Sequence, residues 1–116
     1  MKLLKRLYEI HSPSRNENRI RTFIKQHVSK NTPDAVIEQD AIGNLYITRG
    51  DAENYPCIVA HLDQVQKIHS RDFRAIETRE IIFGYSPSKR QWEGLGADDK
   101  NGIWIALQCL ARYDVI

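Results

Sequence analysis

The sequence predicts an α/β fold in which a mixed sheet is flanked by helices. Apolar residues recur at helical spacing in three stretches, within residues 3–10, 20–28 and 103–110. Between these stretches lie short segments rich in β-branched and aromatic residues, which are typical of strands. The run 57–60 is apolar without alternation, and such a run is typical of a central strand covered on both faces.

The composition indicates one domain at most, because 116 residues suffice for a single core. A net charge of +2, without runs of Lys and Arg interleaved with aromatic residues, argues against a nucleic-acid partner. Lys5, Arg6 and Glu9 interrupt the N-terminal leucines, so we expect no signal peptide, and no apolar run is long enough for a membrane partner. The two cysteines form no CxxC pair or disulfide framework, so we expect a cytoplasmic protein.

The first helix is expected within residues 3–10. Three apolar residues at helical spacing give it one buried face. Pro13 disfavours helical backbone at Ser12, so this helix should end before that point.

A second helix should begin after Ser14 and Glu17, which have the S-x-x-E spacing of a capping box. In such a box each side chain accepts the backbone amide of the other residue. The helix should end near residues 31–33. We expect His27 to be partly buried and structural, because it lies beside the apolar face formed by Ile20, Phe23, Ile24 and Val28.

Two hairpins are expected in the middle of the chain. Residues 36–38 and 45–48 should pair antiparallel, because a Gly-Asn turn lies between them. Residues 73–77 and 81–85 should form the second hairpin. The segment before it has no periodicity, and we expect His69 within it to be exposed because its neighbours are polar.

The third helix is expected from about Lys100 to Arg112. So much of its circumference is apolar that we expect it to be buried on more than one side. Gly102 and Ala106, four residues apart, would let it approach the sheet closely. Its apolar residues are Ile103, Trp104, Ile105, Ala106, Leu107 and Leu110.

The stretch 94–102, Gly-Leu-Gly-Ala-Asp-Asp-Lys-Asn-Gly, opens this helix with two adjacent carboxylates, Asp98 and Asp99. A carboxylate pair in a glycine turn suits a hard cation, because side chains do not crowd the backbone there. The simpler alternative is a glycine loop in which Asp99 is only the N-cap of the helix.

His61 and Asp63 follow the apolar run, where the expected central strand ends. In open α/β sheets, ligands bind beyond the carboxyl ends of the strands. Residues two apart in an extended segment point the same way, so Asp63 can reach the His61 imidazole. A carboxylate on a histidine is the arrangement that orients a metal-bound ring. Together with the aspartate turn, this pair supplies both halves of a dinuclear metal site.

At these residues the sequence resembles the co-catalytic zinc exopeptidases, the family that includes peptidase T, carboxypeptidase G and the aminoacylases. Ala-His-Leu-Asp at 60–63 and the stretch 94–102 are similar to two N-terminal metal-site motifs of that family, especially in its peptidase T-like members. The resemblance extends to residues 10–14 with Glu17 and to residues 40–44, so it covers nearly the whole chain.

The resemblance implies a role for each site residue. His61 would bind one metal ion, Asp63 would be the catalytic residue that orients His61, and Asp98 would bridge both ions. The peptide bond between Asp98 and Asp99 would be cis. The turn that supports the site, outside the ligand set, would consist of Gly96, Asp99, Lys100 and Gly102.

The function implied by the resemblance is that of a zinc-dependent aminopeptidase or di- or tripeptidase. Such an enzyme hydrolyses short peptides with a water activated by two zinc ions. One alternative is an aminoacylase- or desuccinylase-like enzyme that hydrolyses N-acyl amino acids, and another is a non-catalytic module. A phosphate-binding loop is disfavoured, because GK[ST] is absent and Asp98 and Asp99 would repel an anion.

The family's general-base glutamate, a further carboxylate ligand and a distal histidine have no counterpart in this sequence. We therefore expect residues 1–116 to be a truncated N-terminal part of a zinc-peptidase catalytic domain, without a lid or dimerisation domain. Because catalytic zinc sites normally have three protein ligands, this chain should bind zinc weakly and be inactive alone. Apolar surfaces left uncovered should make it self-associate.

Overall fold

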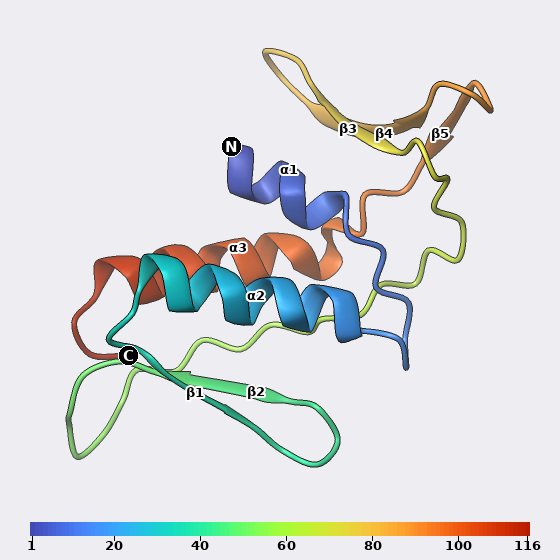
Figure 1. Ribbon diagram of the computed structural model, residues 1–116. Coiled ribbons are helices and arrows are strands. Elements are labelled where there is room, and N and C mark those ends of the chain that lie inside the picture. The colour runs from blue at the N-terminus through green and yellow to red at the C-terminus, as the bar shows by residue number, and fades with distance from the viewer.

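The computed structural model describes residues 1–116 and contains three helices and five strands, which confirms the α/β class. The three helices lie between two small sheets (Figure 1). None of the helices combines the length and the apolar character needed to cross a membrane. In chain order the elements are α1 (Lys2–Tyr8), α2 (Asn18–Asn31), β1 (Val36–Gln39), β2 (Leu45–Thr48), β3 (Arg74–Glu77), β4 (Ile82–Ser86), β5 (Gln91–Glu93) and α3 (Ala97–Arg112).

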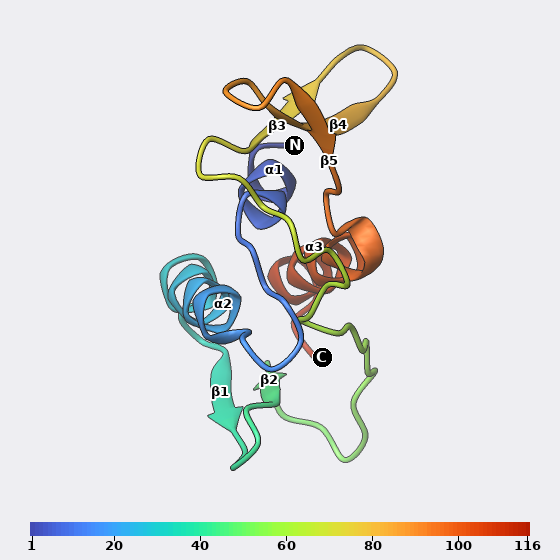
Figure 2. The ribbon, with the colours of Figure 1, turned by 90° about the vertical axis from the view of Figure 1, so that its right-hand side faces the viewer.

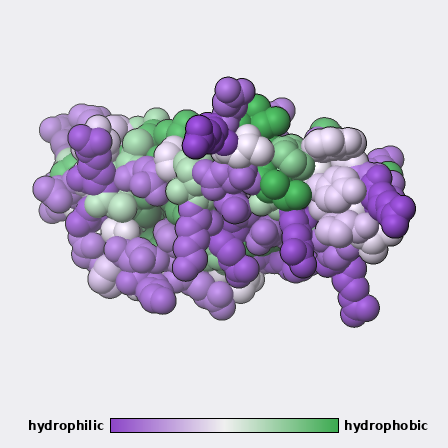
Figure 3. Space-filling view, turned by 90° about the horizontal axis from the view of Figure 1, so that it is seen from above, coloured by the Kyte–Doolittle hydropathy of each residue, from purple (hydrophilic) through white to green (hydrophobic).

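The molecule is elongated, with extents of 52 × 35 × 21 Å, because the two sheets lie on opposite sides of the helices (Figures 1 and 2). The hairpin β1–β2 lies beside α2 at one end, and the sheet β3–β4–β5 lies beyond α1 at the other. The face seen in Figure 3 carries hydrophobic patches among hydrophilic residues. Among single residues, Ile42, Val59 and Val65 are more than four-fifths exposed, at 83%, 85% and 83%.

The first hairpin is confirmed. Strands β1 and β2 pair antiparallel, with Ile37 opposite Ile47. Asp40 holds the turn because its Oδ1 accepts the backbone amides of Ile42 at 3.1 Å and Asn44 at 2.8 Å. The side chains of Ile37 and Ile47 pack against the helical core, which fixes the hairpin on that side.

The second hairpin is also confirmed, as β3 and β4, but the structure adds a third strand. Strand β5 pairs antiparallel with β4, with Trp92 opposite Tyr85. Its last residue, Glu93, is buried, and its carboxylate accepts the backbone amide of Ser70 at 2.8 Å. Because the buried residue of this strand is the charged Glu93, the sequence shows no apolar alternation here and does not predict the strand.

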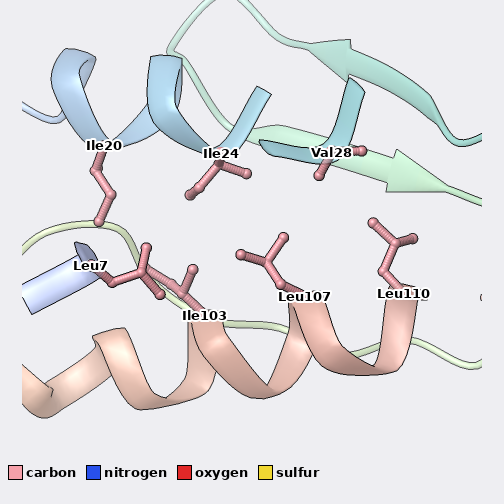
Figure 4. Packing of buried hydrophobic residues seen from close by; sticks show 7 residues of the cluster. All are labelled: Leu7, Ile20, Ile24, Val28, Ile103, Leu107 and Leu110. Atoms are coloured by element: carbon pink, nitrogen blue, oxygen red, sulfur yellow. The ribbon is translucent and has the colours of Figure 1, made fainter. Parts of the chain in front are cut away.

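The main core lies where α2 faces α3 (Figure 4). The apolar spacing predicted both helices and the face that each one buries. On α3, however, Ile105 is 49% exposed, so the expectation that this helix is buried on more than one side is wrong for that residue. The seven core residues are Leu7, Ile20, Ile24, Val28, Ile103, Leu107 and Leu110.

The prediction of a mixed sheet is wrong. The strands form two separate antiparallel sheets, and the isolated bridge between Pro13 and Gln64 is the parallel contact. The run 57–60 is not a strand, and Cys57, expected to be buried, is exposed. Ala60 packs on the core while Val59 is 85% exposed. An apolar run becomes a central strand only if strands flank it, and here the core covers one side alone.

The capping box is not formed. Helix α2 begins at Asn18 without a side-chain cap, and Glu17 accepts the backbone amide of Arg15 at 2.7 Å instead. The Ser14 hydroxyl is engaged elsewhere, because it donates to the carboxylate of Asp63. A distant carboxylate has therefore displaced the local partner.

Candidate metal centre

Backbone pairing brings the segment before α2 alongside the residues that follow His61. The amide of Gln64 donates to the Ser12 carbonyl at 2.8 Å, and the Gln64 side chain accepts the Ser12 amide at 3.2 Å. Both residues are buried. This pairing places Asp63, the residue before Gln64, within reach of the loop that carries Ser14.

The imidazole of His61 lies between two carboxylates, as predicted. Its Nδ1 is 3.1 Å from Oδ1 of Asp63 and 3.0 Å from the Asp63 backbone carbonyl, and its Nε2 is 2.9 Å from Oδ1 of Asp98. Residues 61–63 are thus joined to the glycine turn 37 positions later in the chain. The setting is open, since the His61 side chain is 51% exposed and that of Asp98 is 95% exposed.

The charges in this cluster stabilise one another. The hydrogen bond to Asp98, followed by that to Asp63, raises the pKa of His61 above its ordinary value. The hydrogen bond from Ser14, followed by that from His61, lowers the pKa of Asp63. The cluster therefore favours an ionised Asp63 beside a protonated His61 ring.

The two aspartates of the glycine turn point to different partners. The peptide between Asp98 and Asp99 is cis, as the resemblance implies, and both residues have non-helical backbone angles within α3. Asp98 faces His61, whereas Asp99 accepts the backbone amide of His61 at 3.3 Å and that of Gly102 at 3.0 Å. Asp99 thus acts as a cap at the start of the regular part of α3.

Gly102 makes room for this cap. A Cβ atom at Gly102 would lie 2.3 Å from Oδ1 of Asp99. The expectation that Gly102 allows close approach to a sheet is therefore wrong, since the neighbour is the Asp99 carboxylate. Gly96 has a left-handed φ of 65° and packs against the Gln64 side chain, so the turn is joined to the His61 segment there too.

Lys100 supports the turn from inside the molecule. Its side chain is buried, and its Nζ donates to the carbonyl of Ile10 at 2.5 Å and to Oε1 of Gln64 at 2.6 Å. Burial lowers the pKa of Lys100 to about 8. The ammonium therefore ties α3 to the end of the first helical segment and to the residue after Asp63.

The expectation that His69 is exposed is wrong, because the residue is partly buried. Its ring stacks between those of His11 and Phe73, with ring centroids 4.9 Å and 4.3 Å apart. Its Nδ1 is buried without a hydrogen-bond partner. Burial, followed by the charges of His11 and Lys100, lowers the pKa of His69 to about 4.

His27 is partly buried, as expected, because its ring stacks against that of Phe23 at a centroid distance of 6.1 Å. Burial lowers its pKa. It takes no part in the cluster around His61.

The donor atoms of His61 and Asp98 fit zinc as a partial site. Imidazole nitrogen and carboxylate oxygen are common zinc ligands, and two such donors on one tetrahedral ion lie about 3.3 Å apart. Nε2 of His61 and Oδ1 of Asp98 are 2.9 Å apart, so they would have to separate only slightly to hold one ion between them. Histidine, cysteine and carboxylate side chains nowhere gather in a group of three or more that could hold a metal ion.

Comparison of the chain with models of protein families, with curated proteins and with solved structures found no match.

Proposed function

We propose that this chain carries part of the metal site of a zinc-dependent peptidase, of the kind that the co-catalytic zinc exopeptidases represent. The observation that carries the proposal is the His61 ring held between Asp63 and Asp98. Segments 37 residues apart supply the two sides of this arrangement. The resemblance in the two motifs assigns ligand roles to the same side chains.

In this proposal His61 and Asp98 would hold one zinc ion, and the Asp98 carboxylate would also hold a second. Asp63 accepts the proton on Nδ1, so Nε2, once it gives up the proton it shares with Asp98, would be the ring nitrogen that binds the metal. Asp99 holds the His61 backbone and the start of the helix, so both ligands stay in register. When bound, the metal ions would polarise the scissile carbonyl and lower the pKa of the attacking water.

The substrate we propose is a short peptide in the cytoplasm. Both cysteines are free, and Cys57 is exposed, which suits a reducing compartment. No glutamate takes part in the hydrogen bonds around His61, so a general base has to come from another segment or chain. Hydrolysis therefore requires more than the residues that surround His61.

The test is an assay of the protein purified from its source through an affinity tag on the natural gene. With zinc added, it should release the N-terminal residue from di- and tripeptides. The variants His61→Ala and Asp98→Asn should lose this activity, whereas Asp51→Asn, on an exposed loop, should keep it. Cleavage of N-acyl amino acids alone would favour the amidohydrolase. Peptide cleavage that persists in His61→Ala would contradict the proposal.

A further inference from the structure

Ser14 lies at the outer end of a chain of hydrogen bonds that ends at the candidate metal ligands. Its hydroxyl donates to Oδ2 of Asp63, and the other carboxylate oxygen, Oδ1, faces Nδ1 of His61 at 3.1 Å. Nε2 of the same ring faces Asp98 at 2.9 Å. Four side chains from three distant parts of the sequence are thus connected in one line.

The two contacts of Asp63 use different oxygens, which gives Ser14 a definite mechanical effect. A carboxylate held on one oxygen can rotate about its terminal torsion, which is broad for Asp. With Ser14 on Oδ2 and His61 on Oδ1, rotation breaks at least one of the two bonds. The hydroxyl therefore fixes the plane of the Asp63 carboxylate, which is one of two Asp63 groups at Nδ1 of His61. The other is the Asp63 backbone carbonyl, at 3.0 Å.

The position of Ser14 does not depend on this bond alone. The amide of Gln64 donates to the Ser12 carbonyl at 2.8 Å, and the Asn16 amide donates to the Pro13 carbonyl at 2.8 Å. These backbone contacts place the loop beside Asp63 even without the hydroxyl. Ser14 is exposed, so its removal leaves no cavity in the core.

We propose that Ser14 is a positioning residue, whose hydroxyl holds the Asp63 carboxylate so that the His61 ring is aimed at Asp98. The meaning of this aim for metal binding rests on the proposed function. The restraint on the ring does not, because every contact involved exists without metal. Serine is well suited here, since it donates without adding charge to a cluster that already has two carboxylates.

The experiment compares Ser14→Ala with Ser14→Thr, which keeps the hydroxyl, and with Asn16→Ala, which changes the same turn without touching Asp63. The first readout is carbon-13 relaxation of the His61 ring by NMR in metal-free protein at neutral pH. Ser14→Ala should increase the fast motion of the ring, while Ser14→Thr and Asn16→Ala should match the natural protein. An unchanged ring in Ser14→Ala would overturn the proposal.

The second readout is zinc affinity, with zinc chloride as the probe. Loss of a direct partner of a metal-bound histidine typically weakens metal binding about 10–100-fold, so the more remote Ser14→Ala should weaken it about 3–10-fold. The double variant Ser14→Ala/Asp63→Ala should be no weaker than Asp63→Ala, because Ser14 acts through Asp63. Additive losses would overturn this role. If the natural protein binds no zinc while Ser14→Ala loosens the ring, the positioning role stands and the proposed function fails.

Discussion

The carboxylate of Asp99 accepts the backbone amide of His61 at 3.3 Å, across 38 positions of the chain. The same carboxylate accepts the amide of Gly102 at 3.0 Å, at the start of the regular part of α3. The Asp99 side chain thus joins the backbone of His61 to helix α3, which carries Asp98 at its start. Asp98 and His61 meet because their supporting segments are tied together beneath them.

The first prediction concerns this tie. Asp99→Ala should lower the free energy of unfolding by about 0.5–2 kcal/mol, the usual cost of losing a cap. Asp99→Asn, which keeps one acceptor oxygen, should lose less. Urea unfolding measures both. Equal losses in the two variants would contradict a role for the oxygen acceptor.

Gly102 provides a matched test of the same contact. Gly102→Ala should destabilise the natural protein, because the new Cβ would lie 2.3 Å from the Asp99 carboxylate. In the Asp99→Ala background the same change should stabilise, by about 0.5–1 kcal/mol, as Ala normally does inside a helix. A change of the same sign in both backgrounds would show that the two residues do not conflict.

The second prediction concerns the buried ammonium of Lys100. Lys100→Met should lower the free energy of unfolding by about 1–3 kcal/mol, because two oxygens lose the hydrogen bond from Nζ. These are the carbonyl of Ile10 and Oε1 of Gln64. Lys89→Met, at an exposed site, should change it by less than about 0.5 kcal/mol. Similar losses in the two variants would indicate that Lys100 contributes no buried hydrogen bonds.

The third prediction is a pH dependence that arises from His69. Its pKa falls from 6.5 to about 4 on folding, so between these values the unfolded chain takes up a proton that the folded chain does not. The contribution of His69 to stability is complete above pH 6.5 and declines as the pH falls toward 4. His11, Lys100 and Glu93 supply the nearby charges.

His69→Phe keeps a ring between His11 and Phe73 but cannot take up a proton. The loss of stability between pH 7 and pH 5, measured by urea unfolding, should be smaller in this variant. His61 contributes with the opposite sign, because its pKa is raised, but it does so in both proteins. An identical loss in the two proteins would contradict the assigned shift.

The fourth prediction is self-association. Val59 and Val65 are 85% and 83% exposed, and hydrophobic patches are also visible on the face in Figure 3. Exposed apolar patches favour contact between copies. Sedimentation at high concentration should show oligomers that decrease in Val59→Lys. Gln108→Lys, which adds the same charge on α3, should not reduce them, and a monomeric natural protein would refute the prediction.

Local patterns predicted the helices and hairpins well. The apolar spacing of α2 and α3 identified the faces that meet in the core, and the Gly-Asn turn identified the first hairpin. Sequence patterns do not predict strand β5, because its three residues include a buried Glu93 and carry no apolar alternation. The composition of the run 57–60 suits burial and predicts a strand, but pairing depends on neighbours that composition does not reveal.

Local sequence patterns likewise indicate only part of the geometry of the candidate site, because its other contacts join distant segments. The spacing of His61 and Asp63 is local, and the resemblance supplied Asp98 as their partner. The local spacing of Ser14 predicts a capping box, and nothing local indicates a partner 49 residues away. The resemblance places Lys100 only in the turn, whereas in the structure its buried ammonium bonds to Ile10 and Gln64 in two other segments.

The central claim is that His61 and Asp98 are two ligands of one zinc site, and calorimetric titration of the 116-residue chain with zinc tests it most directly. The natural chain should bind zinc with a micromolar or weaker dissociation constant, because two protein ligands are fewer than the three usual in catalytic sites. His61→Ala and Asp98→Ala should each abolish the measurable heat, whereas Asp51→Ala should keep it. Zinc binding that is unchanged in His61→Ala, or submicromolar binding by the natural chain, would contradict the account.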